Sequence, residues 1–221
     1  MTQHLIFDMD GTLVDSCAIC VDILTGMRSE RGCADAIDPI GARGYMSQGG
    51  TQMVAALLGP ACQEPEADLA EFRARYASTV TPRDALFPGV GDGLSALHKA
   101  GFILSICSNK PQNLCEQVLR DTGLDGLFDV VVGGRPGLRS KPAPDMLDAT
   151  LAELGAKAYQ CIYIGDSELD HQVANAAQIP FLFMTYGYAD HGWLPGDGEI
   201  FDCFTQMTRS VVDGIALRAA E

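Results

Sequence analysis

Two aspartates placed two residues apart, Asp8 and Asp10, are the residues of this chain best suited to do chemistry. They follow the apolar run Leu5–Phe7, which predicts a buried strand, and they precede a turn at Gly11. Side chains at positions i and i+2 of a strand point to the same face, so both carboxylates can act on one substrate atom. Charged side chains are almost never buried unless they are paired or bind a metal. The pair therefore indicates a functional site.

Further polar side chains follow the later apolar runs of the sequence. Ser108 and Asn109 stand between an apolar run and a helix, where a hydroxyl beside free N–H groups forms an anion site. Lys141 lies in a proline-rich segment that restricts the backbone around it. Asp166 follows another apolar run, and Asp170 comes about one helical turn later. The sequence thus predicts four carboxylates, a hydroxyl and a lysine at one edge of a sheet.

The elements that must position these residues alternate between strand and helix from about residue 82 onward. The expected strands are 102–107, 130–132, 161–164 and 181–184, and the expected helices are 111–122, 144–154 and 168–178. Such alternation indicates right-handed crossovers and a parallel sheet, to which Leu5–Phe7 also belongs. The last of these helices ends in Gln178, and because glutamine is disfavoured in a left-handed cap we expect another kind of ending. A strand fragment and a closing helix are expected in 201–220.

Residues 16–81 interrupt this alternation, because their pattern is helical throughout and contains no β-rich run. We therefore expect an α/β protein with two domains. The parallel-sheet, Rossmann-like core would comprise residues 1–15 and 82–221, and an inserted helical cap domain would comprise residues 16–81.

Composition narrows the possible partners. The chain has 221 residues, is 47% hydrophobic and carries a formal charge of −14, which argues against nucleic acid and anionic membrane surfaces. No apolar run approaches the ~20 residues of a membrane span. We expect no signal peptide and a cytoplasmic location, where the eight cysteines would be reduced. Cys17 and Cys20 match C-x-x-C without a second pair, and the sequence leaves their redox activity open.

Taken together, four motifs resemble the haloacid dehalogenase superfamily, and within it most closely the phosphoglycolate phosphatase group with a helical cap. These motifs are Asp8-x-Asp10-Gly11-Thr12, Ser108-Asn109-Lys110, Lys141-Pro-x-Pro and Gly165-Asp166-x-x-x-Asp170. The resemblance implies a phosphatase that acts on a small phosphorylated metabolite such as 2-phosphoglycolate. It covers nearly the whole core and is weak in the cap.

The resemblance also implies residue roles that the chemistry supports. Asp8 would attack phosphorus and form a phosphoaspartate, and Asp10 would act as general acid and base. Ser108, Asn109 and Lys141 would bind the phosphoryl oxygens. The metal ligands would be the carboxylates of Asp8 and Asp166 and the backbone carbonyl of Asp10, with Asp170 steadying them or binding through water.

Charge balance favours Mg²⁺ as the cofactor. Two like unit charges ~4 Å apart repel by ~4 kcal/mol at a surface-like effective dielectric constant. Lys141 cannot offset several such repulsions between four carboxylates and a phosphate dianion, whereas a divalent cation can. We therefore expect the activity to require the metal.

The cap offers candidates for substrate recognition in its glycine-rich turn. Arg43 suits a substrate carboxylate, and the run Ser47, Gln48, Gly49 and Gly50 allows close approach of the backbone to a ligand. The alternative interpretation is an ordinary turn between helices with a solvated arginine.

Other functions of the same motif set stay open at this point. A dehalogenase typically lacks a carboxylate at the position of Asp10. A sugar-phosphate mutase usually has a histidine early in the first cap helix, and residues 17–31 contain none. A pyrophosphatase, and an inactive binding or regulatory homologue, are further alternatives. The sequence does not decide between a monomer and a homodimer, and it assigns no role to the loop 186–198.

Overall fold

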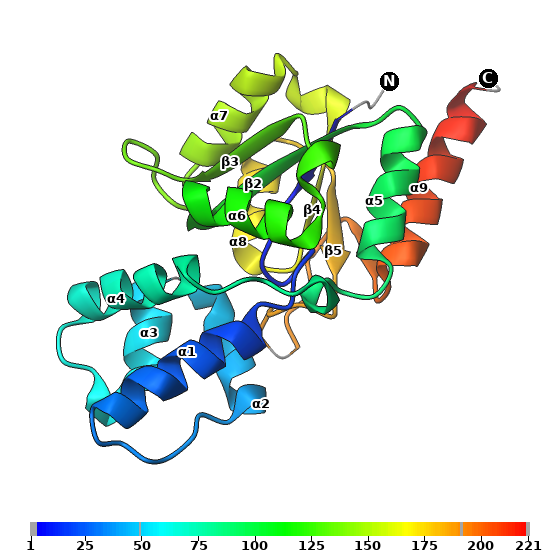
Figure 1. Ribbon diagram of the computed structural model, residues 1–221. Helices are drawn as coiled ribbons and strands as arrows, with labels where there is room; N and C mark the ends of the chain where they lie inside the picture. The colour runs from blue at the N-terminus through cyan, green and yellow to red at the C-terminus, as the bar shows by residue number, and fades with distance from the viewer. Residues whose placement is uncertain (1–3, 49, 191, 220–221) are drawn as a thin grey trace.

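The computed structural model describes residues 4–48, 50–190 and 192–219 (Figure 1). Its centre is a six-stranded sheet in the order β3-β2-β1-β4-β5-β6, in which all neighbouring strands are parallel. The strands are β1 (His4–Phe7), β2 (Ile103–Pro111), β3 (Val130–Gly134), β4 (Cys161–Gly165), β5 (Phe181–Met184) and β6 (Glu199–Phe201). The strand order reverses between β1 and β4, and open α/β sheets bind ligands beyond the carboxyl ends of strands at such a point.

The α-helices of the described chain fall into two groups. Those of the core are α5 (Val90–Lys99), α6 (Gln112–Thr122), α7 (Asp145–Leu154), α8 (Glu168–Ala176) and α9 (Phe204–Ala219). Those of the cap are α1 (Cys17–Glu30), α2 (Pro39–Ala42), α3 (Gly50–Leu58) and α4 (Pro65–Ala77). In Figure 1 the cap helices lie together beyond one end of the sheet. No α-helix in the described residues is long and apolar enough to span a membrane.

Alternating side chains of the strands feed two separate apolar cores, one on each face of the sheet. Leu5 and Phe7 of β1 pack into the core that α5, α6 and α9 cover. Ile6, which points to the other face, packs into the core beneath α7 and α8. A sheet covered by helices on both faces needs strands that are apolar throughout, as these are. The predicted α/β fold is confirmed, with each expected strand and helix present within a few residues of its predicted bounds.

Two details differ from expectation. Strand β2 continues to Pro111, so Ser108 and Asn109 lie within the last part of the strand rather than after it. The prediction that α8 ends without a left-handed residue is wrong, because Gln178 has a φ of 56°. This conformation lets the amide of the buried Ile179 donate to the carbonyl of Ala174 at 2.9 Å, which closes the helix end.

The chain enters and leaves the cap through two segments that pair with each other. The amide of Asp15 donates to the carbonyl of Ala85 at 2.8 Å, and the amide of Phe87 donates to the carbonyl of Leu13 at 3.0 Å. An antiparallel bridge joins Val14 to Leu86. The cap is therefore attached to the core at one place, directly beside Asp8 and Asp10. The domain boundaries at residues 15/16 and 81/82 stay a prediction.

Local features of the sequence explain why helix α4 of the cap forms. Pro65 stands in its first turn, where a missing N–H costs no hydrogen bond. Glu66 and Asp68 lie in the first turn and Arg75 in the last, so their charges complement the helix dipole. Leu69, Phe72 and Tyr76 recur at helical spacing and are buried. This face of α4 contacts both α3 and the core helix α6.

Candidate active site

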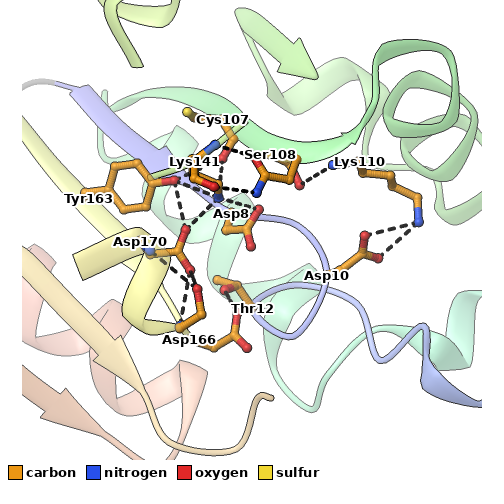
Figure 2. A network of polar contacts seen from close by, with 12 residues as sticks. Asp8, Asp10, Thr12, Cys107, Ser108, Lys110, Lys141, Tyr163, Asp166 and Asp170 are labelled. Carbon is orange, nitrogen blue, oxygen red and sulfur yellow. Dashed lines mark hydrogen bonds and ion pairs between the residues drawn. The ribbon is translucent and has the colours of Figure 1, made fainter. Parts of the chain in front are cut away.

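The polar residues predicted at the strand ends gather at the switch point of the sheet (Figure 2). Asp8 follows β1, Asp166 follows β4, and Ser108 lies near the end of β2. All three side chains are buried and line one cavity. The parallel register places these strand ends side by side, since Phe7 pairs with Ile106 of β2 and with Ile164 of β4.

Lys141 is the centre of the polar network at this edge. Its Nζ lies 2.6 Å from Asp170 Oδ1 and 3.0 Å from Asp8 Oδ1, and it also donates to the Cys107 carbonyl and the Tyr163 hydroxyl. Burial by itself lowers the pKa of this ammonium, but the carboxylates of Asp170 and Asp8 outweigh it and raise the pKa above its usual value. The raised pKa favours the charged ammonium, which lies against the Asp8 carboxylate.

Asn109 holds the Lys141 segment in place. Its Oδ1 accepts a hydrogen bond from the Lys141 amide at 2.7 Å, and its Nδ2 donates to the Lys141 carbonyl at 3.2 Å. Asn109 also lines the cavity. The amide that sequence reasoning assigned to phosphate binding is therefore used, at least in part, to position the lysine.

Two hydrogen bonds hold the Asp166 carboxylate, and two glycines leave the space that it occupies. Its carboxylate accepts from the Thr12 hydroxyl at 2.8 Å and from the Tyr188 amide at 2.7 Å. A Cβ at Gly11 or at Gly187 would overlap this carboxylate, and Gly11 also has a φ of +86° that favours glycine. These glycines let two loops close around Asp166.

The carboxylates of Asp8, Asp166 and Asp170 form an acidic triad with one oxygen of each within 4.8 Å of the others. Burial raises the pKa of Asp8 to about 6, with Lys141 lowering it and Asp170 raising it. Burial and then repulsion by Asp170 and Asp8 raise the pKa of Asp166 well above its usual value. Three buried carboxylates thus lie near the ammonium of Lys141. One positive charge does not balance their combined negative charge.

The acidic triad fits a hard divalent cation. Asp8 Oδ1 is buried, and apart from the Lys141 ammonium it has no hydrogen-bond partner among the described residues. Carboxylate oxygens are the ligands that Mg²⁺ prefers. Asp170 is the least available of the three, because its Oδ1 pairs with Lys141 and Tyr163 and its Oδ2 accepts from the Ser167 amide and hydroxyl.

Asp10 lies apart from the acidic triad and pairs with Lys110, a motif residue to which the sequence assigned no role. Its two carboxylate oxygens lie 3.1 and 3.2 Å from Lys110 Nζ. The same ammonium lies 4.0 Å from the centre of the Tyr76 ring, which belongs to the cap helix α4. Figure 2 shows Asp10 and Lys110 facing each other to one side of the Asp8–Lys141–Asp170 network. The carboxylate of Asp10 points toward Lys110 and away from the triad.

A cavity of about 140 Å³ lies between this polar edge and the cap. The cap contributes Met46, Ser47, Gly50, Met53, Leu69, Phe72, Arg73 and Tyr76, and the core contributes the residues described above together with Tyr188. Drug-sized ligands occupy roughly 300–1,000 Å³, so this cavity suits a smaller molecule. Arg73 is exposed, and among the described residues it has no carboxylate within ion-pair distance.

The cap candidates chosen from the sequence divide into two groups. Ser47 and Gly50 line the cavity, whereas Gln48 bonds the Gly44 carbonyl and is exposed. Gly49 lies outside the described residues. Arg43 does not line the cavity; its Nη1 pairs with Asp15 Oδ2 at 2.8 Å.

Arg43 instead joins the cap to the loop that follows β5. Its Nη2 donates to the Tyr186 carbonyl at 3.0 Å, and its guanidinium lies 4.9 Å from the centre of the Tyr188 ring. The Tyr188 hydroxyl donates to Asp15 Oδ1 at 2.7 Å. From the loop to which the sequence assigned no role, Tyr188 thus lines the cavity, and Tyr186 and Tyr188 contact the Arg43–Asp15 pair.

The cysteines of the C-x-x-C match show no redox geometry. All eight cysteines are free thiols, and Cys17 and Cys20 are buried. Burial raises the pKa of Cys17 to about 11 and that of Cys20 to about 12. Thiols that stay protonated at neutral pH are poor nucleophiles and poor metal ligands.

Comparison with known proteins gives one consistent result. The family model for haloacid dehalogenase-like hydrolases matches residues 5–184. The chain is 35% identical over 195 residues to the phosphoglycolate phosphatase of Rhodobacter capsulatus, a match that covers 85% of this chain and 86% of the relative. It is 34% identical over 198 residues to the phosphoglycolate phosphatase of Colwellia psychrerythraea, covering 84% and 85%. A solved putative phosphoglycolate phosphatase from Lactobacillus delbrueckii subsp. bulgaricus superposes with a TM-score of 0.80 at 26% identity, covering 96% of this chain and 99% of that one.

Proposed function

Because the chain belongs to the haloacid dehalogenase-like hydrolases and is a phosphatase, we propose that it hydrolyses small phosphomonoesters through a phosphoaspartate on Asp8. The observation that carries the proposal is the position of the Asp8 carboxylate, 3.0 Å from the Lys141 ammonium and at the wall of a small cavity. With a pKa of about 6, Asp8 is mainly ionised at pH 7 and is available as a nucleophile.

In the first half-reaction an Asp8 oxygen forms a bond to phosphorus while the bond from phosphorus to the ester oxygen breaks. Asp10 gives its proton to that leaving oxygen, which departs as an alcohol. In the second half-reaction a water molecule attacks the phosphoaspartate and gives a proton to Asp10. Inorganic phosphate leaves, and both aspartates return to their starting protonation states.

The remaining residues of the site bind and orient the phosphoryl group. Lys141 would neutralise charge on the phosphoryl oxygens, because its ammonium already lies beside the attacking carboxylate. The Ser108 hydroxyl lines the cavity next to Asp8 and would donate to the same group. Asn109 would contact it directly or act through its two hydrogen bonds to the Lys141 backbone.

We expect Mg²⁺ to be the cofactor of this site. Asp8, Asp166 and the carbonyl of Asp10 would hold it, with Asp170 binding through water or steadying Lys141. When bound, the ion offsets the negative charge of the triad and of the phosphoryl group. The raised pKa values of Asp8 and Asp166 support the need for such a charge.

For the substrate we propose 2-phosphoglycolate or a molecule of similar size and charge. Support comes from the small cavity and from the relatives that carry the name phosphoglycolate phosphatase. On the cap side Ser47 and Gly50 line the cavity, and Arg43, Gln48 and Gly49 stay recognition candidates of the same turn. Arg73 also lines the cavity, and its guanidinium would suit a substrate carboxylate. The oligomeric state, monomer or homodimer, stays open. The cytoplasmic location stays a prediction.

A screen of phosphate esters with Mg²⁺ tests the proposal, with Asp8→Asn as the matched control because amide and carboxylate have the same shape. We expect phosphate release from small esters, 2-phosphoglycolate among the best, and its loss after exhaustive chelation. Asp8→Asn should release no phosphate with any ester. Turnover by Asp8→Asn at the native rate would refute the phosphoaspartate, and full activity after chelation would refute the metal.

A further inference from the structure

The mechanism proposed for the site leaves one of its buried cations without a role. Lys110 has a side chain that is 7% exposed, and its ammonium contacts both oxygens of Asp10 at 3.1 and 3.2 Å. Lys141, by contrast, contacts the nucleophile and the acidic triad. The site thus contains two lysines, one for each catalytic aspartate.

The contact between Lys110 and Asp10 fixes the direction of a carboxylate. An ammonium that contacts both oxygens opposes rotation of the carboxylate about its last bond. A general acid must lie within about 2.6–3.2 Å of the atom that it protonates, so its orientation limits its rate. Asp10 is 28% exposed in its side chain and comes directly before Gly11, so little else in the core restrains it.

Lys110 is itself held from the cap side. The centre of the Tyr76 ring lies 4.0 Å from its ammonium, a distance typical of a strong cation–π contact. Tyr76 is 1% exposed, and its hydroxyl has no hydrogen-bond partner among the described residues. The contact that the geometry shows is therefore with the ring of Tyr76. The chain Asp10–Lys110–Tyr76 links a core loop to cap helix α4.

We propose that Lys110 is a positioning residue that aims the Asp10 carboxylate at the leaving oxygen, and that the ring of Tyr76 holds Lys110 for this purpose. The inference rests on the proposed function, in which Asp10 is the general acid. It adds a dependence on the cap, because the acid is correctly oriented only while α4 lies against Lys110. If the cap opened, Asp8 would stay in place, but the carboxylate of Asp10 would no longer be held toward the leaving oxygen.

Leaving groups of different basicity separate this role from a structural one. Glycolate leaves as a basic alkoxide and needs the proton, whereas p-nitrophenolate is a stable anion and leaves without it. Single-turnover release of the alcohol, with enzyme in excess, reports the first half-reaction alone. The two substrates are therefore 2-phosphoglycolate and p-nitrophenyl phosphate, compared in each variant under these conditions.

Lys110→Met removes the charge and keeps the length of the side chain. We expect alcohol release from 2-phosphoglycolate to slow about 10²-fold, the lower range of general acid–base catalysis, and release of p-nitrophenolate to stay near the wild-type rate. Lys110→Arg, which can also contact both carboxylate oxygens, should recover most of the loss. If Lys110→Met folds poorly, Lys110→Arg and the Tyr76 variants carry the test.

Two variants at Tyr76 form a matched pair for the second part of the proposal. Tyr76→Phe keeps the ring and should keep the wild-type ratio between the two release rates. Tyr76→Leu removes the ring and should slow release from 2-phosphoglycolate about 30-fold, in line with the strength of one buried cation–π contact. Release of p-nitrophenolate should not change in either variant.

Several outcomes would overturn the inference. Equal loss with both substrates in Lys110→Met would mean a structural role, and no loss with either would mean no role. Equal rates for Tyr76→Phe and Tyr76→Leu would remove the cap from the proposal. Asp8→Asn is assayed beside them: phosphate release by that variant would defeat the proposed function itself, whatever the Lys110 variants show.

Discussion

The two walls of the cavity are built in different ways. On the core wall most charged side chains are buried, and Lys141 is held by Asp8, Asp170, Tyr163 and a backbone carbonyl. On the cap wall most side chains are apolar, and the one charged residue, Arg73, has no carboxylate partner among the described residues. In the proposed function, the core wall would react with a phosphoryl group, and the cap wall would select what is attached to it.

This difference follows from the elements that carry the two walls. The core wall consists of strand ends in a parallel sheet whose register leaves little freedom. The cap wall consists of helices attached through one pair of connecting segments, at Asp15 and Ala85 among others. Reaction requires fixed geometry, whereas selection of a substrate requires an element that can open and close.

The largest expected effect is on the core wall. Lys141→Met leaves Asp8 and Asp170 buried without their cation, and breaking a buried pair in this way costs about 3–5 kcal/mol of stability. We expect kcat to fall about 10³-fold, because the phosphoryl oxygens also lose a charged donor. Thermal unfolding and steady-state kinetics measure both. Lys99→Met, at an exposed lysine of α5, is the matched control, and equal effects of the two changes would mean that the network is unimportant.

The next effect concerns the pH dependence of the core wall without metal. The pKa of Asp8 is raised from 3.8 to about 6, so the folded protein binds this proton more tightly than the unfolded chain. The contribution of this tighter proton binding to the free energy of unfolding is complete below pH 3.8. It is lost as the pH rises through about 6. The raised pKa of Asp166 acts in the same direction.

We therefore expect Asp8→Asn to raise the Tm of chelator-treated protein more at pH 7.5 than at pH 5. Mg²⁺ should raise the Tm of the wild type at pH 7.5 by binding the folded state alone. A Tm difference between variant and wild type that does not change with pH would contradict the assignment of a raised pKa to Asp8.

A smaller effect distinguishes the two arginines of the cap. Arg73→Ala should raise KM for 2-phosphoglycolate about tenfold with little change in kcat, because the bound substrate would lose one charged hydrogen bond. Arg43→Ala removes a half-exposed pair with Asp15, worth at most about 1 kcal/mol, and should lower the Tm slightly without changing KM. If KM rose in the Arg43 variant and not in the Arg73 variant, Arg43 would be the recognition residue, as the sequence predicted. Substrate selection would then belong to the 43–50 turn.

The smallest effect lies outside both walls. Gln178 is a non-glycine residue at a φ of 56°, and Gln178→Gly should stabilise the end of α8 by about 0.5–1 kcal/mol. Activity should not change, because Gln178 does not line the cavity. Chemical denaturation measures the gain in stability, and an altered kcat would show that α8 transmits strain to Asp166 or Asp170.

The sequence by itself determined the reactive edge. Asp8, Ser108 and Asp166 could be predicted because each follows or ends a short apolar run, and a parallel sheet brings such ends to one edge. Lys141 could be predicted from its proline-rich segment and from the motif that contains it. Helical periodicity in 16–81 likewise predicted the inserted cap. These inferences use only local pattern and the direction of the strands.

Only the tertiary structure decided which side chains meet across the cavity. Lys110 reaches Asp10 over a separation of 100 positions in the chain, and Tyr76 reaches Lys110 from another domain. The sequence favoured Arg43 as the recognition arginine and did not single out Arg73, yet the first pairs with Asp15 and the second lines the cavity. Periodicity states which face of an element is buried, but the distance between remote elements depends on how their side chains pack, and no local pattern contains that distance.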